Sequence, residues 1–190
     1  MKRIILLAVM ALSAYTGYGQ SIIKCTNNEI YWYIKGDEAN YAVGLSGDIA
    51  EGNFSDLLNV EDKMLQYQVL DKKFYLEENS ENTDEDVLKR YYAKEAAQLA
   101  EMYGKPVEIQ MQMMLSEAEK LIMLWHYKTP KGASEQVEAQ LMANVVFGDR
   151  IFLLASPQLN WHEFDDVKTF LIKAITNTRT AADENSLCGK

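Results

Sequence analysis

Residues 137–156, VEAQLMANVVFGDRIFLLAS, decide the fold of this chain. Apolar residues occupy every second position from Val137 to Phe147, which is the period of a β-strand with one buried face. Gly148 and Asp149 follow as a pair typical of a tight β-hairpin, and a second apolar run covers residues 150–155. The stretch therefore predicts two antiparallel strands joined by a short turn.

Two more strands are expected immediately before this hairpin. Residues 107–115 and 121–127 alternate with the period of a strand, and residues 129–132 (Thr-Pro-Lys-Gly) form a turn. A single helix over residues 107–124 is the alternative, because Met and Gln favour helices. Four consecutive strands with short connections predict an antiparallel sheet.

Amphipathic helices are predicted before and after these strands. The first begins at Thr83, where Asp86 lies three residues on as in a capping box, and it ends at Gly104. The second covers residues 164–175, with acidic residues in its first turn. Helices that flank an antiparallel sheet in sequence predict an α+β domain.

The N-terminal third gives weaker signals. Residues 30–34 (Ile-Tyr-Trp-Tyr-Ile) predict a strand, and residues 41–45 are its expected hairpin partner. Residues 49–61 show no period and are expected to form a loop with at most one helical turn. A second hairpin is predicted over residues 64–77, and residues 180–190 are expected to be a polar tail.

The first twenty residues have the layout of a cleavable secretory signal. Lys2 and Arg3 precede an apolar run over residues 4–14, and small and polar residues follow as far as position 20. That run is shorter than the ~20 apolar residues that span a membrane, and no transmembrane segment is expected elsewhere. We therefore expect an exported protein, periplasmic or extracellular, with one domain over residues 21–179.

The charge of the chain disfavours polyanionic partners. The sequence carries 19 basic and 28 acidic residues, a net charge of −9, and loss of Lys2 and Arg3 would change this to −11. Nucleic acids and anionic lipids attract proteins through Lys and Arg, so neither is expected to be a partner. A basic protein, a cationic peptide or a divalent cation remains compatible with this charge.

Cys25 and Cys188 lie near opposite ends of the exported chain. In an oxidising compartment they are able to form a disulfide that closes nearly the whole chain into one loop. Two unpaired thiols at the ends of the domain are the other interpretation, because spacing alone does not show that the ends meet.

No catalytic, metal or cofactor motif is found. The two histidines, His126 and His162, have no HExxH or comparable spacing. Glycine-rich phosphate loops, CxxC pairs and calcium loops are also absent from the sequence. We therefore expect no catalytic residues, no metal ligands and no cofactor.

Four aromatic residues near the N-terminus form a candidate partner surface: Tyr31, Trp32, Tyr33 and Tyr41. Exposed aromatic side chains of this kind bind sugars or peptide side chains. On a strand, however, Tyr31 and Tyr33 face away from Trp32, so at least one set is expected to lie in the core.

Residues 83–178 resemble the PsbP-like superfamily, which includes photosystem extrinsic proteins and small secreted bacterial proteins of the DcrB type. The resemblance lies in the order of elements, the Phe147-Gly148-Asp149-Arg150-Ile151 hairpin, the strand at residues 153–156, and Trp161 before the last helix. It implies an α/β/α sandwich around an antiparallel sheet, and a binding or scaffold role without enzymatic activity.

The sequence thus favours an exported, non-enzymatic binding or scaffold protein of the bacterial cell envelope, which contacts a protein or another envelope component. The alternative is a hydrolase or metal-dependent enzyme whose site is assembled from residues distant in sequence.

Overall fold

The computed structural model describes residues 19–52 and 54–188. The predicted secretory signal at residues 1–20 lies outside the described residues except for its last two positions. The elements, in chain order, are β1 (Gly19–Lys24), β2 (Ile30–Lys35), β3 (Asn40–Leu45), β4 (Ile49–Glu51), β5 (Leu57–Val60), β6 (Lys63–Asp71), η1 (Lys72–Tyr75), α1 (Asp84–Tyr103), β7 (Ile109–Leu115), β8 (Leu121–Lys128), β9 (Val137–Phe147), β10 (Arg150–Leu159), α2 (Phe164–Thr176), β11 (Thr178–Ala181) and η2 (Glu184–Ser186).

The strands form two antiparallel sheets. The larger has seven strands in the order β4-β5-β6-β10-β9-β8-β7, and the smaller has four in the order β1-β2-β3-β11. Arg150 pairs with Phe147 across the predicted tight turn, so the hairpin at Gly148 and Asp149 is confirmed. Residues 107–124 contain β7 and part of β8, so the single-helix alternative is wrong.

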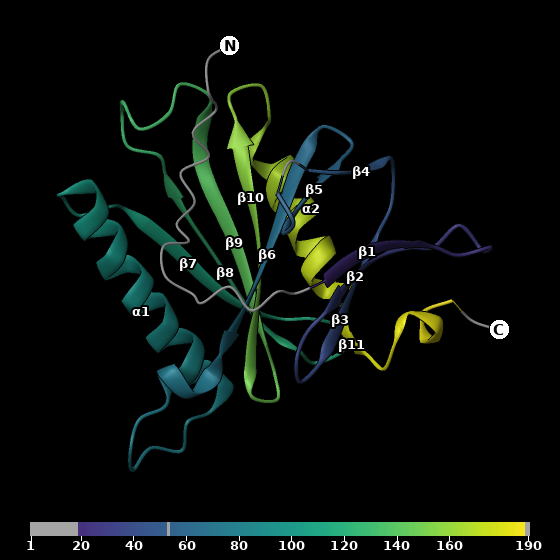
Figure 1. The fold of residues 1–190 in the computed structure, drawn as a ribbon. Coiled ribbons are helices and arrows are strands. Elements are labelled where there is room, and N and C mark those ends of the chain that lie inside the picture. The colour runs from purple at the N-terminus through teal and green to yellow at the C-terminus, as the bar shows by residue number, and fades with distance from the viewer. Residues whose placement is uncertain (1–18, 53, 189–190) are drawn as a thin grey trace.

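The larger sheet is covered on both faces (Figure 1). Val87, Leu88 and Tyr91 of α1 pack on one face, and the other face is covered jointly by α2 and by the smaller sheet. The α+β class with antiparallel sheets is therefore confirmed. The predicted sandwich is met only in part, because its second outer layer combines a helix with a sheet.

Local capping explains where α1 begins and ends. Thr83 Oγ1 accepts a hydrogen bond of 3.2 Å from the Asp86 amide and donates one of 2.6 Å to the Asp86 carboxylate. At the other end, Gly104 adopts a left-handed conformation with φ of 64°. This element matches the sequence prediction because both signals are local.

Two predictions for the N-terminal half are wrong. Residues 64–77 do not form a hairpin: β6 pairs with β5 and β10, and the chain then enters η1, where Asp71 accepts a hydrogen bond from the Lys73 amide. Residues 49–61 are not a loop, since they contain β4 and β5. Both strands are too short to show a period in the sequence.

The C-terminal residues are also more ordered than the sequence predicts. β11 pairs with β3, and η2 follows it. Leu187 is only 3% exposed and packs with Tyr33 and Ala42 on the outer face of the smaller sheet. As far as residue 188, the predicted polar tail is thus part of the fold. No helix of the described residues is long and apolar enough to cross a membrane.

Candidate binding groove

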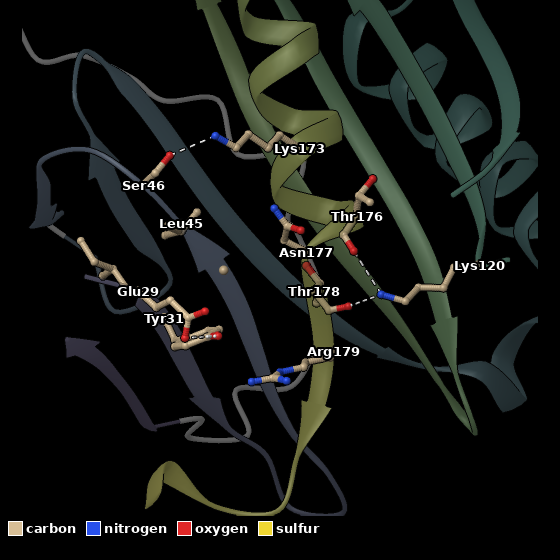
Figure 2. Close-up of a pocket in the computed structure, with 12 residues that line it drawn as sticks. Glu29, Tyr31, Leu45, Ser46, Lys120, Lys173, Thr176, Asn177, Thr178 and Arg179 are labelled. Atoms are coloured by element: carbon tan, nitrogen blue, oxygen red, sulfur yellow. Dashed lines mark hydrogen bonds between the residues drawn. The ribbon is translucent and has the colours of Figure 1, made fainter. Parts of the chain in front are cut away.

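A cavity of about 420 Å³ opens between the smaller sheet and the junction of α2 with β11 (Figure 2). We call it the basic groove. Its lining residues come from β2, β3, the turn before β8, and the α2–β11 junction: Glu29, Ile30, Tyr31, Gly44, Leu45, Ser46, Lys120, Lys173, Thr176, Asn177, Thr178 and Arg179.

Gly44 allows the two walls of the groove to approach each other. β11 pairs with β3 only from Asn40 to Val43, and the next residue, Gly44, donates a backbone hydrogen bond of 3.1 Å to the Asn177 carbonyl. A Cβ atom at Gly44 would lie 3.3 Å from the Cβ of Asn177, which is closer than ordinary packing. The small residue therefore sets the width of the groove at this end.

Lys120 ties the end of α2 to the larger sheet. Its ammonium donates hydrogen bonds to the carbonyls of Thr176, at 3.1 Å, and Thr178, at 2.6 Å. The last carbonyls of a helix lack intrahelical partners and carry the negative end of the helix dipole, so a cation stabilises them. Burial lowers the pKa of Lys120. Two of the three N–H groups of Lys120 thus donate to backbone carbonyls at the α2–β11 junction.

Two further cations border the groove. Lys173 donates a hydrogen bond of 3.1 Å to Ser46 Oγ, and the guanidinium of Arg179 lies 5.2 Å from the centre of the Tyr31 ring. Tyr31 in turn donates a hydrogen bond of 3.1 Å to the Glu29 carboxylate. Burial, and next the hydrogen bond to Glu29, raise the pKa of Tyr31.

The chemistry of these side chains suits binding of an anionic group. Lys120, Lys173 and Arg179 line a cavity with one carboxylate, that of Glu29. For Ser46 to act as a nucleophile, a neighbouring base would have to take its proton. A lysine serves as such a base when burial removes its amine from water. Lys173 is exposed, and it donates its hydrogen bond to Ser46 from the solvent side of the cavity wall rather than from a buried position.

A second cavity, of about 390 Å³, lies along α2 next to the basic groove. The two cavities share Gly44, Leu45, Ser46 and Lys173. The second is lined by charges of both signs and by the apolar side chain of Phe170. The two cavities therefore adjoin at these four residues.

The structure buries most of the aromatic residues that were predicted to form a partner surface. Trp32, Tyr33 and Tyr41 are at most 4% exposed. Trp32 packs against Tyr67 and Tyr41 against Phe152, both of the larger sheet, while Leu187 covers Tyr33. The prediction is wrong for these three, because both faces of the smaller sheet are covered. Tyr31 alone of the four lines the basic groove.

The two histidines have separate structural surroundings. His126 packs against Phe164, and burial, followed by the charges of Lys168 and Lys128, lowers its pKa. His162 is 8% exposed, with Nε2 3.3 Å from the Asp62 carboxylate. Within residues 19–52 and 54–188, no group of three or more His, Cys, Asp or Glu side chains is placed to hold a metal ion.

Cys25 and Cys188 form a disulfide across 163 residues of sequence. The bond fastens the C-terminal segment that carries Leu187 to the turn after β1, so it holds that segment against the smaller sheet.

Sequence reasoning missed the basic groove. Its cations, Lys120, Lys173 and Arg179, come from three segments, and no motif connects them. The nearest local signal was Lys173 near the end of α2, which also suits the helix dipole. The set is complete only in the folded chain, where Lys120 binds the carbonyls of Thr176 and Thr178 at the α2–β11 junction.

Comparison with solved structures finds a likeness to cyanobacterial PsbP from Synechocystis sp. PCC 6803. The alignment covers 90% of this chain and 98% of that chain, at 9% sequence identity and a TM-score of 0.45. The sequence matches no protein-family model and no curated protein. At this identity and TM-score, the likeness transfers no site to this chain.

Proposed function

We propose that this protein is an exported, non-enzymatic binding or scaffold protein of the bacterial cell envelope, and that its basic groove holds an anionic group of a partner protein or another envelope component. The observation that carries the proposal is the gathering of Lys120, Lys173 and Arg179 around one cavity, in a chain of net charge −9. The overall charge repels polyanions, whereas a cationic cavity attracts a single carboxylate or phosphate group.

The disulfide between Cys25 and Cys188 supports the exported location. Disulfides persist in oxidising compartments such as the periplasm and the extracellular medium, and they are rare in the cytosol. The leader pattern at residues 1–20 supports the same location.

The proposal includes the family resemblance of residues 83–178. We infer that this region shares the PsbP-like arrangement with DcrB-type secreted proteins, on the order of its elements and its Phe147–Ile151 hairpin. We infer that residues 21–179 belong to one domain, which the C-terminal segment extends as far as Leu187.

A comparison of captured partners tests the groove. Tagged protein is incubated with detergent extracts of the native envelope, and a Lys173→Glu/Arg179→Glu variant is expected to lose the partners that the wild type retains, because the groove then repels an anion. A Lys128→Glu/Lys131→Glu variant changes the charge equally at exposed positions outside the groove. The proposal is contradicted if the groove variant still captures the partners of the wild type. It is also contradicted if the two variants lose these partners to the same extent.

A search for turnover tests the non-enzymatic part. The purified protein is incubated with ester, peptide and glycan substrates, with and without divalent metal ions, and we expect no product above the uncatalysed rate. Turnover that disappears on changing His126 or His162 to Ala would favour the hydrolase or metal enzyme instead.

A further inference from the structure

β7 (Ile109–Leu115) ends the larger sheet and pairs on one side only, with β8, among the described residues (Figure 1). It has seven residues, IQMQMML, none of them charged, in a chain that is 25% charged. Its register with β8 is continuous, without a bulge. Natural edge strands are usually protected by charge, proline, bulges or short length, and β7 has none of these.

The opposite edge of the same sheet shows such protection. β4 (Ile49–Glu51) has three residues and ends on an acidic side chain. A strand that short offers few backbone groups to an incoming strand. The two edges of one sheet therefore differ, and β7 is the open one.

Apolar side chains are exposed along this open edge. Met111 is 38% exposed and Leu115 is 67% exposed. α1 packs mainly on η1, β8 and β9, and Gln110 and Gln112 of β7 are exposed as well.

The sequence around β7 is complementary to itself in antiparallel orientation. When Met111 lies opposite its counterpart, the pairs on the same face are Ile109 with Met113 and Val107 with Leu115, all of them apolar. On the other face Gln110 lies opposite Gln112, and Glu108 lies opposite Met114, the one pair that sets a charged side chain against an apolar one. Beyond the strand, Lys105 falls opposite Glu117, so no like charges are opposed.

We propose that β7 is a docking edge for a second copy of this chain, which adds its own β7 in antiparallel orientation with the two Met111 residues opposite each other. The two larger sheets then form one continuous sheet across a two-fold axis. Such an isologous contact is closed, because each β7 is used once and no unpaired β7 remains for a third copy. Main-chain hydrogen bonds and burial of Met111 and Leu115 stabilise it.

Sedimentation equilibrium of the purified protein over a range of concentrations tests whether the chain dimerises through β7. The wild type is expected to dimerise reversibly, and Met111→Lys to be monomeric, because it places two like charges directly opposite each other. Gln136→Lys, at an exposed position outside β7, is the control and is expected to dimerise like the wild type. Circular dichroism checks that each variant is folded.

Cysteine crosslinking tests the register. Met111→Cys is expected to form covalent dimers readily on mild oxidation, because directly opposed residues lie ~5 Å apart between Cα atoms. Leu115→Cys lies on the same strand, but its two copies would be ~27 Å apart in this register and are expected not to crosslink. A monomeric wild type, including one whose β7 instead pairs with a strand of another protein, overturns the proposal. Dimerisation that survives Met111→Lys, or equal crosslinking of the two cysteine variants, overturns it as well.

Discussion

Glu95 shows how one side chain in α1 couples the fold to pH. Its carboxyl is half-buried between α1 and the larger sheet, and burial raises its pKa to about 7, although Lys94 opposes this shift. The negative charge of Glu95 also helps to raise the pKa of Tyr75, which burial raises to about 12. A carboxyl in such surroundings is most stable in its neutral form.

Replacing Glu95 tests this assignment through the pH dependence of unfolding. The pKa of the Glu95 carboxyl is higher in the folded state than in the unfolded state. The contribution of the neutral carboxyl to the free energy of unfolding is therefore fully present at acidic pH and is lost as the pH rises through about 7. Glu95→Gln cannot ionise, so at alkaline pH it should be more stable than the wild type by about 1–3 kcal/mol, and nearly equal to it at acidic pH. Urea unfolding at both pH values measures the difference. Glu101→Gln, an exposed change on the same helix, is the control, and a pH-independent difference for Glu95→Gln would contradict the prediction.

At the scale of elements, the sequence predicted a helix or hairpin correctly where capping or turn residues mark its ends. Thr83 and Gly104 define α1, and Gly148 defines the β9–β10 hairpin. The hairpin predicted around Asp71 was wrong because Asp71 instead caps a short 3-10 helix. β6 pairs with β5 just before it and with β10, which lies far along the chain, and no local pattern identifies β10 as a partner.

The N-cap of α1 is expected to contribute about 1 kcal/mol to the free energy of unfolding. Thr83→Ala removes the oxygen that accepts the Asp86 amide and should lower the free energy of unfolding by that amount. Thr83→Ser keeps the hydroxyl and should be close to the wild type. Urea denaturation of the three proteins measures the effect, and equal losses in both variants would show that the cap is not its cause.

The junction of α2 and β11 depends on Lys120. Lys120→Met removes the donor for the carbonyls of Thr176 and Thr178, and we expect a loss of about 1–3 kcal/mol, because partly buried acceptors lose their partner. Lys128→Met, at an exposed lysine at the far end of β8, should change stability little. Thermal unfolding of both variants, measured side by side, is the test; an equal shift in the two melting temperatures would argue against the capping role.

At the scale of the whole molecule, the smaller sheet combines strands from the N-terminal and C-terminal parts of the chain. β1 and β2 come from the N-terminal side, β11 comes from the C-terminal side, and the disulfide joins Cys25 to Cys188. The basic groove lies where this sheet meets α2, so its geometry depends on contacts between segments that are distant in sequence.

Removal of the disulfide should therefore affect global stability. The bond closes a loop with a sequence separation of 163, for which the chain-entropy model gives about 5 kcal/mol, and about 2–5 kcal/mol is expected in practice. A Cys25→Ser/Cys188→Ser variant should unfold at lower urea concentration than the wild type. A reductant should lower the midpoint of the wild type to that of the variant and leave the variant unchanged; a wild type indifferent to reductant would refute the prediction.

The sequence by itself determined the strand and helix periods, the capped ends of α1, the tight β9–β10 turn and the α+β class, because each depends on neighbours within a few positions. Tertiary structure alone decided that Trp32, Tyr33 and Tyr41 are core residues and that residues near the C-terminus complete a sheet. It also decided that Lys120 and Arg179 share a cavity. The physical reason is that burial and cavity formation depend on which distant segments pack together, and a periodic pattern specifies that a face is buried without specifying what covers it.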